Sequence, residues 1–413
     1  MTSLRTASTQ DRARAEELVD ALVAPLTEPG EFDSAASGQS LSRGPAGIAL
    51  AHIEHAHHDV ADARQRLHRW ARVAMAHPIS SSELAGLHAG LPAVSFLLHL
   101  AEPVIREYHD TLTALDAHLL RLAHRRVDAA LDRIRNGRLA DFTEYDLLRG
   151  LTGIGQLLLR HMPGSDALAR VLDYLVQLTK PITMRGDVLP GWWVEHDPDR
   201  LLPTPGGHTN LGMAHGIAGP LALLSHALRG GITVDGHQEA IARFCEHFDH
   251  WQQDGEAGSR WPYWIDRHDH ARGRIAQREP ARPSWCYGTP GIARVQQLAG
   301  IATGDTTRQH TAEAALVACL TDQRQLGLIT DQGLCHGWAG LYLTAAHAAN
   351  DAATPDLAAQ LPPLAGHLTE HAARTPPPEL GLLDGATGTA LALKASATQG
   401  LPCSGWDQCL LIT

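Results

Sequence analysis

Two of the six cysteines stand in matching contexts, and one of them is followed by a histidine. Cys286 lies in SWCYGTPG and Cys335 in LCHGWAG, so each comes two residues before a glycine that opens a G-x-x-G sequence. Thiolates and imidazole favour zinc over magnesium or calcium. Three protein ligands are typical of a catalytic zinc whose fourth position is open. Cys286, Cys335 and His336 therefore predict a Cys₂His zinc site, and the alternative is two cysteines packed as small apolar residues.

A histidine and a carboxylate occupy related positions elsewhere in the chain. His215, in AHGIAG, precedes its glycine as His336 does, and Asp146 comes four residues before a glycine in EYDLLRG. Such a pair can form an oriented acid and base. The alternative for Asp146 is a helix cap or a salt bridge, and Asp384, directly before Gly385, is either a cap or a residue lining the same site.

Three further residues flank Cys286. Arg282, Trp285 and Tyr287 are predicted to bind substrate or to supply hydrogen bonds to the metal ligands.

The remaining cysteines and histidines are predicted to have no chemical role. Cys245 and Cys319 lie in amphipathic helical patterns typical of a core, whereas Cys403 and Cys409 could pair only under oxidation. His208 and the histidines of AHIEHAHHDVADARQRLHRW are predicted to lie on solvated helix faces.

The glycines that follow the candidate site residues belong to a repeat, and this repeat places the site residues at equivalent positions. Seven times a glycine, two residues and a second glycine precede an apolar helical run. The copies are GPAGIAL from Gly44, LHAGLPAV with Leu87 in the first position and Gly90 in the second, GLTGIGQLLL from Gly150, GIAGPLALL from Gly216, GTPGIARV from Gly288, GWAGLYL from Gly337 and GATGTALAL from Gly385. A first turn without side chains predicts close approach to neighbouring helices.

The segments between the copies also have helical periodicity, for example 110–135 and 310–320. Strand signals are few, and those in 188–194 and 259–265 predict hairpin decorations. Seven helix pairs could form an open solenoid, but the terminal copies keep their apolar helices and are not polar caps. We therefore predict an all-α fold, an α/α toroid of seven inner and seven outer helices. It forms a single domain over 1–413, with an outer-helix segment at 1–40 and the repeats from about 41.

Composition excludes other classes of function. The chain has 34 Lys plus Arg against 45 Asp plus Glu and no basic run, so a nucleic-acid partner is not expected. No apolar stretch of signal-peptide or transmembrane length occurs. These features predict a cytoplasmic protein.

The motifs RPSWCYGTPG, GLCHGWAGL and AHGIAG resemble those of the lanthionine synthetase C family of lanthipeptide cyclases, and the resemblance runs from about Gly44 to the C-terminus. It implies an α/α toroid with bound zinc that closes thioether rings in a precursor peptide. It also implies that Cys286, Cys335 and His336 are the zinc ligands. The residues that it places in the active site are His215, Asp146, Arg282 and Tyr287.

In the implied reaction, a peptide cysteine thiol adds to dehydroalanine or dehydrobutyrine to form lanthionine or methyllanthionine. No dehydratase or kinase-like region precedes the repeats, so we expect a separate dehydratase to supply the dehydrated precursor peptide. Alternatives are addition of an external thiol such as glutathione, a non-catalytic peptide-binding scaffold, and a toroidal glycosidase. A glycosidase would need paired carboxylates, for which only Asp146 and Asp384 qualify.

Overall fold

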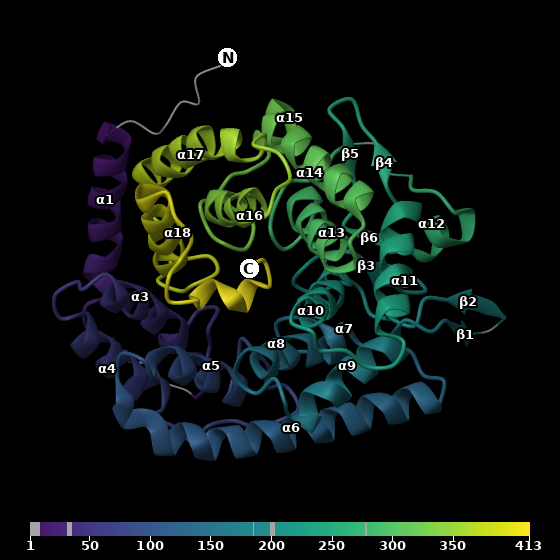
Figure 1. Cartoon of the computed structure of the whole chain (residues 1–413), viewed down its shortest axis with the longest axis horizontal. Helices are drawn as coiled ribbons and strands as arrows, with labels where there is room; N and C mark the ends of the chain where they lie inside the picture. Colours follow the sequence, from purple (N-terminus) through teal and green to yellow (C-terminus); the bar gives the residue numbers. More distant parts are fainter. Residues whose placement is uncertain (1–8, 31–34, 185, 199–202, 277–278) are drawn as a thin grey trace. The chain divides into compact units, whose positions relative to one another are not determined.

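The computed structural model describes residues 9–30, 35–184, 186–198, 203–276 and 279–413. They are mostly helical and divide into two compact units (Figure 1). Unit 1 comprises Met1–Leu119, Ile329–Leu411 and Thr413, and unit 2 comprises Leu120–Leu328 and Ile412. The organisation as a single domain stays a prediction.

Each glycine-led copy forms one helix that is almost entirely buried. Pro45, Pro92 and Pro290 stand in the first turn of three of these helices, where proline fits because the amide there has no helical partner. In unit 1 the helices are α3 (Pro45–His57), α5 (Leu91–Ala101), α16 (Trp338–Asn350) and α18 (Ala386–Thr398), and in unit 2 they are α8 (Leu151–His161), α10 (Ala218–Arg229) and α13 (Thr289–Thr303).

A second set of helices is amphipathic and covers the first. They are α1 (Thr9–Val23), α4 (Ala63–Ala74), α6 (His109–Arg135), α9 (Asp166–Leu178), α11 (His237–His250), α14 (Thr306–Thr321) and α17 (Leu361–Arg374). In unit 1, α4 packs on α3, α17 on α16 and α1 on α18, while in unit 2, α9 packs on α8, α11 on α10 and α14 on α13. With α6, the described residues hold seven helices of each kind, as predicted.

The remaining elements are short. The single-turn helices are α2 (Ala35–Gly38), α7 (Phe142–Tyr145), α12 (Arg267–Arg272) and α15 (Gln323–Leu326). The 3₁₀ turns are η1 (Ala24–Leu26), η2 (Arg106–Tyr108), η3 (Ala358–Gln360) and η4 (Trp406–Leu410).

Among the described residues, the strands form three antiparallel pairs, all in unit 2. β1 (Ile182–Met184) pairs with β2 (Asp187–Leu189), and β4 (Gln253–Asp254) pairs with β5 (Ser259–Arg260). The predicted segments 188–194 and 259–265 each begin in one of these short hairpins and continue outside it. β3 (His208–Asn210) pairs with β6 (Trp264–Asp266), an association between distant segments that the sequence did not indicate.

The second copy of the repeat has a different register from the predicted one. Gly90 is the residue that caps the N-terminus of α5, the position of Gly44, Gly337 and Gly385 in their copies. Assigning Leu87 to the first position was therefore wrong. The four-residue pattern in this copy begins at Gly90 and has alanine in place of the second glycine.

A side chain at these glycines would contact the preceding turn of the chain more closely than it would contact a neighbouring helix. A Cβ added at Gly47, Gly340 or Gly388 would clash with the carbonyl oxygen six residues earlier in the chain. A Cβ added at Gly47 would also lie 3.1 Å from Leu382 Cβ, which belongs to the neighbouring copy. The predicted close approach is confirmed, but its main cause is the tight turn that feeds each helix.

Several histidines predicted to be solvated are buried. His208 is fully buried in β3, and His52 and His55 are buried on α3. The prediction failed because α3 is buried from Pro45 to Ala56, so His52 and His55 have no side that faces solvent, and because His208 lies in a buried strand and not on a helix. Cys245 and Cys319 are buried as predicted, and all six cysteines are free thiols.

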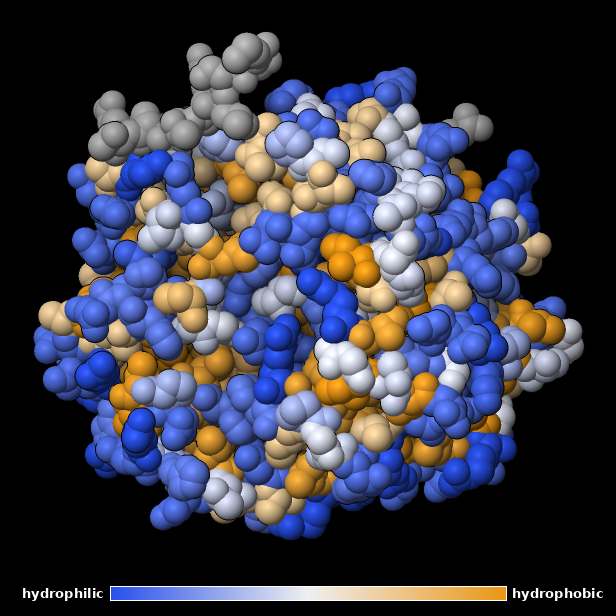
Figure 2. Space-filling view, in the orientation of Figure 1, coloured by the Kyte–Doolittle hydropathy of each residue, from blue (hydrophilic) through white to orange (hydrophobic). Residues whose placement is uncertain are grey.

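Large apolar side chains are rarely exposed on the described residues, and Figure 2 shows a face on which hydrophilic residues predominate around small apolar areas. Among the helices of the described part of the chain, none combines the length and apolarity needed to cross a membrane.

Candidate functional site

In unit 2, the loops that lead into the glycine-led helices are joined by backbone hydrogen bonds. The Leu147 amide donates to the Ala214 carbonyl at 3.2 Å, and the Met213 amide donates to the Cys286 carbonyl at 2.9 Å. These bonds align the loops before α8, α10 and α13 along one edge of the unit. Asp146, His215 and Cys286 lie on these loops.

Asp146 and His215, predicted as an acid and base pair, lie within hydrogen-bonding distance of one another. His215 Nδ1 lies 2.7 Å from Asp146 Oδ2. The Asp146 side chain is completely buried, whereas that of His215 is 28% exposed. Asp146 therefore fixes the orientation of a histidine whose imidazole can reach solvent or a bound molecule.

The alternative role of Asp146, as a cap of the following helix, is not what the structure shows. α8 begins at Leu151, and its N-cap residue, Gly150, has no side-chain capping hydrogen bond. Asp146 Oδ1 instead accepts hydrogen bonds from the amides of Arg149 and Gly150, each at 2.7 Å, in the turn that precedes α8. Its other oxygen lies 2.7 Å from His215 Nδ1, so holding the turn and orienting the histidine use different atoms.

Cys286 lies in a tight loop held by its neighbours. Ser284 Oγ is 3.6 Å from Cys286 Sγ and donates to the Tyr287 carbonyl at 2.5 Å. Gly288 then adopts a φ of 95°, a conformation that favours glycine. Asn210 donates to the Tyr287 hydroxyl at 3.2 Å. The loop therefore holds a buried thiol next to a partly exposed phenol.

Arg282 and Trp285 differ in what they offer to a ligand. Tyr263 donates to the Arg282 carbonyl at 2.8 Å, and burial raises the pKa of Tyr263 to about 12, so this bond stays formed at neutral pH. The Arg282 Nε is buried without a hydrogen-bond partner among the described atoms. Trp285 is completely buried, which favours a packing role. Its predicted contact with substrate stays a prediction.

In unit 1, the corresponding loops are joined in the same way. The Cys335 amide donates to the Leu383 carbonyl at 3.0 Å, and the Leu383 amide donates to the Ser42 carbonyl at 3.0 Å. The Leu41 amide in turn donates to the His88 carbonyl at 3.1 Å. The loops before α16, α18, α3 and α5 thus form one edge, which carries Cys335 and His336.

Two carboxylates flank His336 in unit 1. Its Nε2 is 3.6 Å from Asp331 Oδ2, and its Nδ1 is 3.9 Å from Asp384 Oδ1. Burial raises the pKa of Asp384, and the nearby His336 opposes that shift. The imidazole therefore has an acidic neighbour near each ring nitrogen. In metal-binding histidines of other proteins, a carboxylate at one ring nitrogen orients the ring while the other nitrogen binds the ion.

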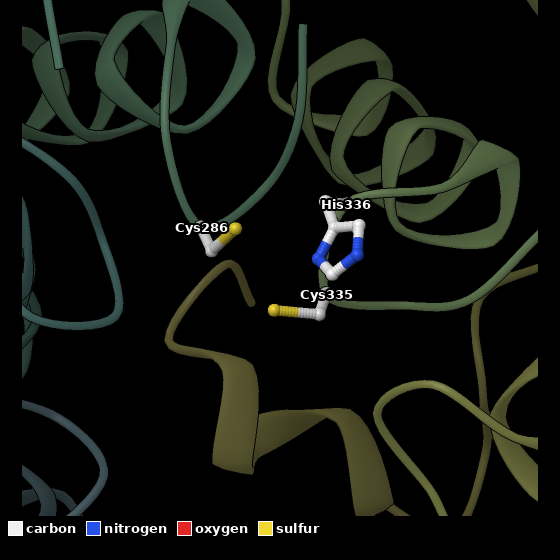
Figure 3. A group of neighbouring side chains, drawn as sticks. All are labelled: Cys286, Cys335 and His336. Atoms are coloured by element: carbon white, nitrogen blue, oxygen red, sulfur yellow. The ribbon is translucent and has the colours of Figure 1, made fainter. Parts of the chain in front are cut away.

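The predicted zinc ligands all lie at helix entries. Figure 3 draws Cys286 on the turn that leads into α13, and Cys335 with His336 on the turn that leads into α16. Cys286 belongs to unit 2, and Cys335 and His336 belong to unit 1. Their role as zinc ligands stays a prediction.

Sequence reasoning missed Asp331 and Asn210. Each lies six residues before the first glycine of its copy, and its side-chain oxygen accepts the amide of Gly333 or Gly212, at 3.2 and 2.9 Å. The available signal was the shared pattern N/D-x-G-x-x-H-G in NLGMAHG and DQGLCHG. This turn gives His215 and His336 equivalent positions.

The helix pairs and the loops at their ends define a class of α/α-toroid proteins. The solved structure of a nisin cyclase matches the chain with a TM-score of 0.79 and 19% identity, covering 98% of both chains. The predicted fold class is thereby confirmed. Residues 36–411 match the family model described as lanthionine synthetase C-like protein. The chain belongs to this family.

A sequence relative points to the same family. The chain is 24% identical over 265 residues to the nisin biosynthesis protein NisC of Lactococcus lactis subsp. lactis. This match covers 62% of the chain and spans 60% of the length of that relative.

Proposed function

We propose that the chain is a zinc-dependent lanthipeptide cyclase that adds peptide cysteine thiols to dehydroalanine or dehydrobutyrine. The observation that carries this proposal is the buried Asp146 holding a partly exposed His215 at 2.7 Å, in a member of the lanthionine synthetase C-like family. The relatives named as nisin cyclase and nisin biosynthesis protein support a peptide substrate.

The proposed zinc ligands are Cys286, Cys335 and His336. Each offers one ligand atom, and two thiolates with one imidazole are a donor set that suits zinc. The carboxylates beside His336 support this assignment, because they would orient the imidazole. When bound there, zinc would supply positive charge that favours the thiolate form of a peptide cysteine.

His215 is the proposed proton carrier. Attack of the thiolate on the β-carbon forms the carbon–sulfur bond and leaves an enolate, which takes a proton at the α-carbon. An imidazole donates and accepts protons near neutral pH, so His215 can take up the thiol proton and deliver one to this carbon. Asp146 keeps Nδ1 engaged and leaves Nε2 for the exchange.

Arg282 and Tyr287 are the proposed substrate-binding residues. The buried Arg282 Nε, for which the described atoms provide no hydrogen-bond partner, would be satisfied by a peptide carbonyl. The Tyr287 hydroxyl accepts a hydrogen bond from Asn210, and a hydroxyl of this kind can both accept and donate. Asp384 is proposed to line the site beside His336, together with Trp285 if the loop opens.

The proposed context is cytoplasmic. A separate dehydratase would supply the dehydrated precursor peptide. A reducing compartment suits a site that depends on free thiols, and all six cysteines are free.

Metal analysis tests the zinc ligands. We expect Cys286→Ala, Cys335→Ala and His336→Ala each to lower the zinc content of the purified protein relative to the wild type, with the far-UV circular dichroism unchanged. The assignment is wrong if the wild type binds no zinc or if none of the three variants changes the zinc content.

An activity assay tests the reaction. The protein is incubated with a dehydrated, cysteine-containing precursor peptide, and free thiols are counted by alkylation and mass spectrometry. We expect the thiols to disappear without change in peptide mass, because addition within one peptide loses no atoms. Thiols that persist with a correct substrate would instead favour a binding scaffold. A mass increase with added glutathione would favour intermolecular addition.

A further inference from the structure

A second group of side chains of the types that bind metals lies entirely within unit 1, at the C-terminal end of α3. Glu54 and His58 are four residues apart on α3 and its C-terminal cap, so they project from one side of the helix. Cys403 lies in the segment between α18 and η4. One ligand atom from each residue lies within 4.8 Å of the others.

The separations of the three atoms match one face of a zinc tetrahedron. His58 Nε2 and Cys403 Sγ each lie 3.3 Å from Glu54 Oε1, and they are 3.6 Å from one another. Zinc bonds of about 2.3 Å to sulfur and about 2.0–2.2 Å to nitrogen and oxygen, at tetrahedral angles, place ligand atoms about 3.4–3.6 Å apart. An ion would thus fit with little movement of the side chains.

Backbone hydrogen bonds fix the carboxylate of this group. Glu54 Oε1 accepts the Cys403 amide at 3.1 Å, and Glu54 Oε2 accepts the Ser404 amide at 3.0 Å. The Glu54 side chain is 5% exposed, while that of His58 is 32% exposed and Cys403 is an exposed residue. Glu54 is therefore fixed and buried, whereas solvent can reach His58 and Cys403. Water could complete the coordination of an ion held by all three.

The amides explain why Glu54 is buried, but not why two metal-ligand side chains meet at the same oxygen. The Cys403 thiol donates to Glu54 Oε1, and His58 Nε2 lies beside both atoms. A divalent cation satisfies all three atoms together, and its charge balances one carboxylate and one thiolate. Binding releases the thiol proton, so the balance is Cys–SH plus M²⁺ giving Cys–S–M⁺ and H⁺.

We propose that Glu54, His58 and Cys403 bind a second divalent cation of the zinc class. This site uses different residues from the proposed catalytic zinc and does not depend on the proposed function. By joining the end of α3 to the segment after α18, the ion would fasten the C-terminal segment of unit 1 to the helix that opens the repeat.

Cobalt binding tests the proposal on the full-length chain. A Cys286→Ala/Cys335→Ala variant removes the thiolates of the first proposed site, so thiolate-to-cobalt absorption reports the second. We expect this background to bind one equivalent of Co²⁺, with release of a proton and with displacement by Zn²⁺. Adding Cys403→Ser or His58→Gln should abolish the absorption and the bound equivalent.

His57→Gln is the matched control, because His57 is an exposed histidine on the same helix outside the group. It should retain the bound equivalent, and circular dichroism should show that every variant is folded. The proposal is overturned if the background binds no cobalt, or if Cys403→Ser and His58→Gln bind as it does. Failure of the first site would appear separately, as wild-type zinc content that Cys286→Ala leaves unchanged.

Discussion

At the scale of single residues, Asp146 has two functions that substitution can separate. Asparagine keeps a carbonyl oxygen for the amides of Arg149 and Gly150, but it presents an amide nitrogen to His215 Nδ1. The imidazole must then accept at Nδ1 and carry its proton on Nε2, so it can no longer act as the base. We expect Asp146→Asn to lower kcat for cyclisation about 10²–10⁴-fold with KM unchanged.

Alanine at the same position should also destabilise the fold. Asp146→Ala removes both hydrogen bonds to the turn before α8 as well as the bond to His215, and we expect the free energy of unfolding to fall by about 1–3 kcal/mol. Chemical denaturation with circular dichroism measures this, with Asp146→Asn close to the wild type. Equal stability of the alanine and wild-type proteins would contradict the role of Asp146 in holding this turn.

Residue types and their register made much of the site predictable. The histidines before Gly216 and Gly337 and the cysteines before Gly288 and Gly337 could be aligned by their glycines, and the Asp146–His215 contact followed. Burial could not be predicted in the same way. His52 was predicted to be solvated because it begins a segment rich in histidine and charged residues, whereas packing on several sides of α3 decides its environment.

At the scale of elements, the turn before each buried helix needs glycine because it leaves no room for a side chain. Gly47, in the first turn of α3, has the Leu41 carbonyl where a Cβ would stand, whereas nothing lies within 4 Å of that position at Gly366 in α17. We expect Gly47→Ala to destabilise the protein by at least about 1–3 kcal/mol, the range for overpacked cores. Gly366→Ala should stabilise it by about 0.4–1 kcal/mol.

Thermal unfolding of the two variants checks this difference. Both positions are glycines inside helices of unit 1, so helix propensity favours alanine equally at each. A Gly47→Ala protein as stable as Gly366→Ala would show that the turn relaxes freely. The same turn geometry explains the misassigned second copy, since the loop into α5 has its glycine at the helix cap and alanine three residues later.

At the scale of the whole molecule, buried histidines should make the protein sensitive to mild acid. Burial lowers the pKa of His52, His55 and His208 to about 4 and that of His247 to about 3. At His52 the cause is visible: Nε2 bonds to the Leu26 carbonyl at 2.8 Å, while Nδ1 is buried with no partner among the described atoms. Protonation would place a charge on that nitrogen.

The sign of the effect follows from proton uptake. Below the ordinary histidine pKa of about 6.5 the unfolded chain binds protons that the folded chain excludes, so stability falls as the pH falls toward 4. Each such histidine contributes up to about 1.4 kcal/mol per pH unit in this interval. We therefore expect the melting temperature to decrease steadily between pH 6.5 and 4.5, before most carboxylates titrate.

A single substitution tests whether the buried imidazoles cause this loss. His52→Gln keeps an amide that can donate to the Leu26 carbonyl but cannot be protonated in this range, so the dependence of melting temperature on pH should become shallower. His57→Gln, at an exposed position on the same helix, should leave the dependence unchanged. A wild-type melting temperature that is constant from pH 6.5 to 4.5 would show that these histidines are protonated without unfolding.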